Sequence, residues 1–407
     1  MGKNRKLDFI CNTIGSLIYA LNSVILLMAV VRILGSDQGG VFSIAYTISQ
    51  TVLVIGNFEM RVFQSTDSGT YAFQDYFLSR VYTSLAMLAV SVVWLFVNGF
   101  EGNKAVVISF LCLYRLSDSF GDVIEGYYQQ TDRLYMSGIL LALRSGLPAV
   151  IFIILLVVTH NLILSSFFLM MFSNVFMLIF DFGLLIIKEK IRFGGGKYKT
   201  AFNLLMVCFP LFVSCFLATY ILNAPKYAID RFLSEEFQTY YGIIFMPSFA
   251  INLISGFIFK PFLLEITSIW EQKKVDRIVS LIFKMALCVL GITFICVLGG
   301  WLIGVPVLTL IYGLDDIVLY KGQLILILTG GGVNAFSIFL YYILTVMRKQ
   351  RAILVGYLVV FFEAVILSDI MVRQMGINGA AWSFLVCNLS LLTIFATEVF
   401  INLKKKI

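Results

Sequence analysis

Apolar stretches of about 20 residues or more recur along the chain and alternate with short polar segments. A helix needs roughly 20 apolar residues to cross a membrane, so each stretch predicts one membrane-spanning helix. A further apolar run at 304–313 is too short to cross again and predicts a turn or short helix at the membrane surface. The pattern therefore predicts an all-α integral membrane protein with about 12 transmembrane helices, at residues 10–33, 39–58, 76–98, 105–127, 135–158, 162–187, 201–222, 237–262, 278–303, 318–346, 351–371 and 376–402.

The composition agrees with this class of protein. Of the 407 residues, 60% are hydrophobic and 13% are charged, which is unlike a soluble globular domain. The seven cysteines lie mostly within apolar stretches and form no CxxC pair, so neither a disulfide framework nor a metal site is predicted. The sequence also lacks a P-loop, a recognisable catalytic triad and a sizeable polar loop for catalysis. We therefore expect a protein that is not an enzyme and needs no cofactor.

Lysine and arginine residues gather in every second loop, as they do on the cytoplasmic side of membrane proteins. Placing the basic N-terminus in the cytoplasm makes both termini cytoplasmic, which requires an even number of spans. The longest basic loop contains three consecutive glycines and has six predicted spans on either side. We expect an N-terminal six-helix lobe at 1–187, a basic linker at 188–200 and a C-terminal six-helix lobe at 201–407. Because the positive charge lies in these loops, it indicates topology and not nucleic-acid binding.

A charged stripe runs along the fourth predicted span. Arg115, Asp118, Asp122 and Glu125 follow one another at steps of three, four and three residues, which places them within roughly an 80° arc of one helix face. Charged side chains cannot face lipid without a large free-energy cost, so this face should meet protein or a water-filled cavity. The stripe indicates either a functional site inside the membrane or an ion-pair ladder that only holds helices together.

Three passages carry a family resemblance: RILGSDQGGVFSIA at 32–45, GVPVLTLIYG at 304–313 and MGINGAAWSFLVCNLS at 375–390. They resemble segments of polysaccharide flippases of the Wzx type, in the MATE-like multidrug/oligosaccharidyl-lipid/polysaccharide exporter superfamily. The resemblance implies two six-helix bundles around a central cavity. It also implies transport of an undecaprenyl-pyrophosphate-linked oligosaccharide, by alternating access, from the inner to the outer leaflet of the cytoplasmic membrane, for cell-surface polysaccharide biosynthesis.

A diphosphate crossing the membrane needs cationic partners, and arginine offers forked donors for it. Arg115 lies about 16 Å in from the end of its span and Arg144 lies at a similar depth in the next, so this pair is the candidate diphosphate site. Arg144 could instead neutralise Asp118 or Asp122. The other candidate substrate-binding residues, near the inner leaflet, are Arg61, Arg80 and Lys260.

The acidic positions allow a second interpretation. The stripe alone has a net charge of minus two, and Glu363 lies near the midplane of the eleventh predicted span. Such groups suit a cation-coupled exporter of small organic cations, and they could also bind a coupling H⁺ or Na⁺. Asp118, Asp122, Glu125 and Glu363 are therefore candidate coupling or cavity residues. Asp181, close to the inner end of its span, is expected to be solvated.

Overall fold

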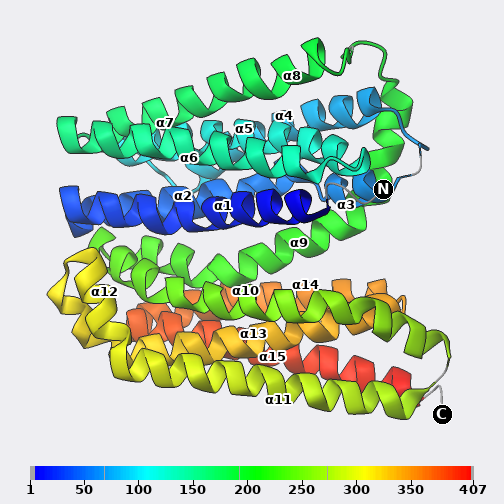
Figure 1. Ribbon diagram of the computed structural model, residues 1–407. Coiled ribbons are helices and arrows are strands. Elements are labelled where there is room, and N and C mark those ends of the chain that lie inside the picture. Colours follow the sequence, from blue (N-terminus) through cyan, green and yellow to red (C-terminus); the bar gives the residue numbers. More distant parts are fainter. Residues whose placement is uncertain (1–4, 68, 192, 273, 405–407) are drawn as a thin grey trace. The chain divides into compact units, whose positions relative to one another are not determined.

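The computed structural model describes residues 5–67, 69–191, 193–272 and 274–404, and in these ranges every regular element is helical (Figure 1). By contacts the chain divides into two compact units, Met1–Phe216 and Leu217–Ile407. The boundary between the units falls inside the helix Tyr198–Phe232, whose first residues belong to the basic segment 188–200. The assignment of 188–200 as the linker between two six-helix lobes stays a prediction.

The first unit contains eight α-helices and the first half of a ninth within its described residues. Its α7 and α8 are joined by a π-helical turn into one long segment, Leu162–Ile187. The elements are α1 (Arg5–Leu34), α2 (Ser36–Asn57), α3 (Met60–Thr66), α4 (Phe73–Val97), α5 (Gly102–Gln130), α6 (Leu134–Thr159), α7 (Leu162–Phe176), the π-helical η1 (Met177–Asp181), α8 (Phe182–Ile187) and α9 (Tyr198–Phe232).

The second unit begins within α9. Its α11 runs through a π-helical turn into α12, which covers the short apolar run at 304–313, so that run is a short helix as predicted. The remaining elements are α10 (Glu235–Glu271), α11 (Val275–Gly299), η2 (Gly300–Gly304), α12 (Val305–Tyr312), the 3₁₀ turn η3 (Asp315–Tyr320), α13 (Lys321–Val346), α14 (Gln350–Met375) and α15 (Ile377–Lys404).

The predicted spans all fall on long helices. Among the described residues, ten helical segments are long and apolar enough to cross a membrane. The other two predicted spans lie on α5 and α10, which have 29 and 37 residues, and α5 differs from the ten because it carries the charged stripe. The chain is an all-helical, multi-pass integral membrane protein.

The helices of the first unit pack closely through small residues. Gly15 on α1 and Gly138 on α6 lie so near the facing backbone that a methyl group at either position would overlap it. Close backbone approach of this kind replaces the hydrophobic driving force that helices lack inside lipid. Because successive helices alternate in direction, the end of α2, the short α3 and the starts of α4, α6 and α9 lie at one end of the unit, on the right in Figure 1.

Candidate functional site

The charged stripe of α5 faces the interior of the first unit. Arg115 has no exposed surface, and its Nη1 donates to Asp118 Oδ2 at 2.7 Å. The Nε of Arg115 donates to the Ser49 hydroxyl at 3.1 Å, and the guanidinium lies 4.5 Å from the centre of the Tyr46 ring. Tyr19 on α1 donates its hydroxyl to the same Asp118 oxygen at 3.3 Å. The N-terminal part of the stripe, Arg115 and Asp118, therefore joins α1, α2 and α5.

Arg144 connects α6 to the stripe and to the π-helical turn. Its Nη1 donates to Asp181 Oδ2 at 2.7 Å, its Nη2 donates to Glu125 Oε1, and its Nε lies 4.0 Å from Asp118 Oδ1. The guanidinium lies against Gly121 of α5, where even a methyl group would overlap it. Asp181 has no exposed surface, so the expectation that it is solvated was wrong: η1 turns its side chain toward the arginine.

The C-terminal part of the stripe, Asp122 and Glu125, binds two further arginines. Arg80 on α4 is fully buried; its Nη2 donates to Asp122 Oδ2 at 2.6 Å and its Nη1 donates to the carbonyl of Gly56. Arg61 on α3 donates from Nη1 to Glu125 Oε2 at 2.6 Å, and the same nitrogen lies 3.6 Å from Asp122 Oδ1. It also donates from Nε to the Gln129 amide oxygen at 3.4 Å.

These contacts form one network, and its charges balance. Four arginine charges meet four carboxylate charges, so the sum is zero and not the minus two of the stripe taken alone. The stripe forms an ion-pair ladder in this conformation. Arg144 pairs closely with Asp181 and Glu125 and lies 4.0 Å from Asp118, whereas the alternative for it named Asp118 or Asp122. The members are Arg61, Arg80, Arg115, Arg144, Asp118, Asp122, Glu125 and Asp181.

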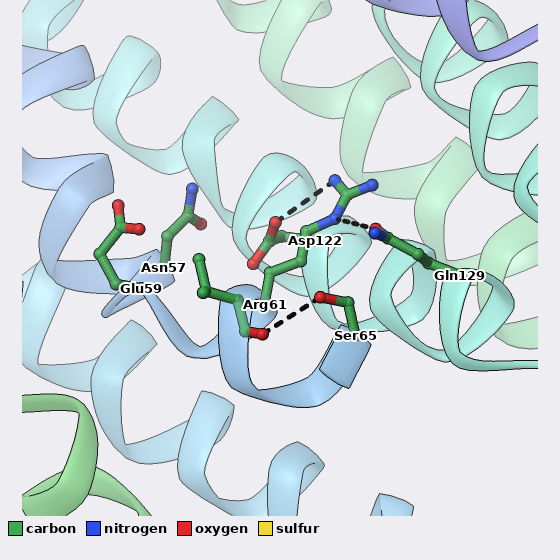
Figure 2. A pocket seen from close by; sticks show the side chains of 7 residues that line it. Asn57, Glu59, Arg61, Ser65, Asp122 and Gln129 are labelled. Atoms are coloured by element: carbon green, nitrogen blue, oxygen red, sulfur yellow. Dashed lines mark hydrogen bonds and ion pairs between the residues drawn. The ribbon is translucent and has the colours of Figure 1, made fainter. Parts of the chain in front are cut away.

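One hollow opens onto this network, and we call it the polar pocket. Figure 2 shows Arg61 between Asp122 and Gln129, with Asn57 and Glu59 on the other side of the pocket. Its volume is about 300 Å³, and Val62 and Ser65 complete its lining. The side chain of Arg61 is 30% exposed, whereas those of Arg80, Arg115 and Arg144 are at most 2% exposed. Of these four arginines, Arg61 is therefore the one that a ligand in this pocket can reach.

The turn beside the pocket has an unusual backbone. Phe58 and Glu59, between α2 and α3, both adopt left-handed conformations, with φ of 50° and 52°. Such a conformation costs a residue other than glycine on the order of 1–3 kcal/mol, and it persists only where surrounding contacts hold it. The Phe58 ring stacks on Phe212 of α9 at a centroid distance of 4.2 Å, and the Gly56 carbonyl before the turn accepts hydrogen bonds from Arg80 and Thr83.

The other predicted site residues belong to the second unit. Glu363 on α14 is partly buried and accepts a hydrogen bond from the Ser390 hydroxyl of α15 at 2.8 Å. The side chain of Lys260 lies outside the described residues. Lys226 is buried within α9, with its ammonium 4.7 Å from the centre of the Phe245 ring. The substrate and coupling roles of these residues and of the network stay predictions.

Several known proteins share this architecture. No protein-family model matches the sequence. The chain is 21% identical over 392 residues to the capsular polysaccharide biosynthesis protein CapF of Staphylococcus aureus, covering 94% of each protein. An inward-facing multidrug resistance MATE family transporter of the MOP superfamily matches 98% of both chains, with a TM-score of 0.67 and 12% identity. The lipid II flippase MurJ in an inward closed conformation gives a TM-score of 0.72 and 14% identity, covering 96% of this chain and 87% of MurJ.

The fold is that of the MATE-like transporters. The similarity to CapF, a protein named for capsular polysaccharide biosynthesis, extends over nearly the whole length of both chains. The resemblance to Wzx-type flippases, read from three short passages, is confirmed at this level of fold and distant full-length similarity.

Proposed function

We propose that the protein is a flippase that moves an undecaprenyl-diphosphate-linked oligosaccharide from the inner to the outer leaflet of the cytoplasmic membrane, by alternating access. The observation that carries this proposal is the similarity to a capsular polysaccharide biosynthesis protein over 94% of the chain. The fold shared with a lipid II flippase supports it, because that protein also handles a lipid-linked substrate. In this proposal both termini are cytoplasmic and the polar pocket opens toward the inner leaflet.

The chemistry of the polar pocket fits the head group of such a substrate. A diphosphate is bound best by forked, permanently charged donors, and the partly exposed guanidinium of Arg61 supplies them. The amides of Asn57 and Gln129 and the hydroxyl of Ser65 line the same pocket and suit sugar hydroxyls. Arg80, Arg115 and Arg144 hold the carboxylates of α5 and η1 in this conformation, so their role in the proposal is to position α5 for Arg61.

The alternative function, cation-coupled export of small organic cations, has less support from this site. A cation exporter needs carboxylates with negative charge to spare, whereas each of the four network carboxylates contacts an arginine. Glu59 is the remaining acidic residue in the pocket lining. A coupling H⁺ or Na⁺ stays compatible with either function, and so does a contribution of Glu363.

The test is reconstitution of the purified protein into liposomes containing undecaprenyl diphosphate linked to a fluorescent sugar. Flipping is measured as the time-dependent gain of fluorescence accessible to a membrane-impermeant quencher. We expect Arg61→Ala to abolish flipping and Arg61→Lys to impair it, since lysine keeps the charge and loses the fork. Arg277→Ala, at an exposed arginine of the second unit, is the control and should flip normally.

One result would contradict the proposed function, and a second would contradict the role given to Arg61. The first is a wild-type protein that transports an organic cation such as ethidium along an ion gradient and flips no lipid-linked sugar. The second is normal flipping per folded molecule by Arg61→Ala, which would remove the pocket arginine from the mechanism.

A further inference from the structure

A second hollow lies directly beside the polar pocket, and it is apolar. This groove has a volume of about 820 Å³ and is formed by α4, the start of α9 and the turn after α2. Its walls are mainly rings and aliphatic carbons, with one cationic side chain among them. The lining residues are Phe58, Tyr82, Thr83, Ala86, Tyr198, Lys199, Phe202 and Leu205.

The turn between α2 and α3 forms the shared wall of the two hollows. Asn57 and Glu59 line the polar pocket, while Phe58 between them lines the groove. Consecutive Cα atoms are about 3.8 Å apart, so the two hollows meet at this turn. The left-handed conformation of Phe58 and Glu59 sets the direction of the turn, and the stack of Phe58 on Phe212 holds the ring on the α9 side.

One end of the groove lies near the membrane surface and the other end lies deeper in the membrane. The start of α9 is fixed to the start of α4, because Lys197 donates its backbone N–H to Asp75 at 3.0 Å and Ser79 donates its hydroxyl to the carbonyl of Ala201 at 3.1 Å. Lys199 is therefore at the shallow end of the groove. Ala86 lies about 10 Å deeper than Ser79, by the rise of seven helical residues. A positive charge at the rim and apolar walls below match an anionic lipid with its chain pointing into the membrane.

We propose that this groove holds the hydrocarbon chain of the lipid-linked substrate while the polar pocket holds its sugar, with the Asn57–Glu59 turn between them. This inference rests on the proposed function and assigns the two chemical parts of the substrate to separate sites. The diphosphate, which joins chain to sugar, then passes the turn between the two cationic side chains, Lys199 in the groove and Arg61 in the pocket. Chain length becomes a property that the protein recognises.

The test fills the groove without removing any of its walls. Ala86→Trp places a large ring in the groove, and Leu85→Trp, at the neighbouring 60%-exposed position outside the groove lining, is the matched control. Two substrates with the same fluorescent diphosphate-linked sugar are compared, one on an undecaprenyl chain and one on a ten-carbon geranyl chain. We expect Ala86→Trp to slow flipping of the long-chain substrate at least tenfold and to change the short-chain rate less than twofold, while the control leaves both unchanged.

The outcomes separate this inference from the proposed function. Equal long-chain rates for Ala86→Trp and Leu85→Trp, with an active wild type, would overturn the groove assignment and leave the flippase proposal intact. No flipping of either substrate by the wild type would overturn both. A photoreactive undecaprenyl diphosphate should label α4 and α9, and competition by phosphatidylglycerol at the same concentration should not reduce that labelling. Full competition would assign the groove to bulk membrane lipid and refute the inference.

Discussion

Replacing Arg144 by alanine should strongly destabilise the protein, because this one side chain compensates buried charges on two elements. The guanidinium binds Glu125 and Asp181, whose side chains are 2% and 0% exposed. After the substitution Glu125 keeps Arg61, but Asp181 loses the one cation that the described residues place against it. Breaking a buried ion pair by removing one partner typically costs about 3–5 kcal/mol, since the remaining charge is left uncompensated.

A second arginine pair gives the matched control. Arg133, at the start of α6, donates to Glu189 at 2.6 Å, but its side chain is 30% exposed and the pair lies at the end of the helix bundle. A partly exposed pair near the surface contributes about 1 kcal/mol or less, because water screens it. The Arg144→Ala variant should therefore lose several times more stability than Arg133→Ala.

The assay measures the thermal midpoint of the purified protein in mild detergent. The midpoint is read from the fraction of protein that stays monodisperse after heating to each temperature. Adding Asp181→Asn to Arg144→Ala should recover part of the loss, because it removes the uncompensated charge and keeps the side-chain volume. Equal midpoints for the Arg144→Ala and Arg133→Ala single variants would refute the reasoning. Equal midpoints would mean that the buried network contributes no more to stability than a pair near the surface.

Two further predictions concern the same unit. Gly121→Ala should lower the thermal midpoint nearly as much as Arg144→Ala, since the added methyl group overlaps the guanidinium, whereas Gly183→Ala, which meets no atom within 4 Å, should not. The hydrogen bond from Arg133 lowers the pKa of Glu189 below its ordinary value of 4.5. The pair therefore stabilises the protein above pH 4.5 and loses its effect as the pH falls through the lowered pKa. The midpoint difference between wild type and Glu189→Gln should shrink over that range, and a constant difference would contradict it.

The spans and the stripe could be predicted from the sequence because both depend on helical periodicity. Apolar stretches of sufficient length fix each long helix, and steps of three and four residues place Arg115, Asp118, Asp122 and Glu125 on one face whatever surrounds them. The burial of this face follows from the cost of exposing charge to lipid. The structure confirms this burial, because Arg115, Asp118 and Glu125 are each at most 5% exposed.

The partners of the stripe could not be predicted, because they depend on how distant helices meet. Asp181 reaches Arg144 through a π-helical turn, which shifts the helical register by part of a turn and has no strong sequence signal. The two left-handed residues of the turn, Phe58 and Glu59, are neither glycine nor asparagine, the residues that usually adopt this conformation, although Gly56 and Asn57 directly precede them. The left-handed turn carries Glu59 in the lining of the polar pocket, so helical periodicity could not predict that pocket.

The sharing of Glu125 between two arginines suggests how a ligand could act on the whole network. Its two oxygens bind different cations, Arg61 at the pocket and Arg144 in the interior. A diphosphate that draws Arg61 away would leave Glu125 to Arg144 alone, and Arg144 also holds η1 through Asp181. Ligand binding would then compete with internal ion pairs, and the free-energy difference between the two pairings would bias the helices that carry them. Under the proposed function, Arg61 is where substrate binding and rearrangement of the first unit are linked. Glu125→Gln should therefore strengthen head-group binding while it slows flipping.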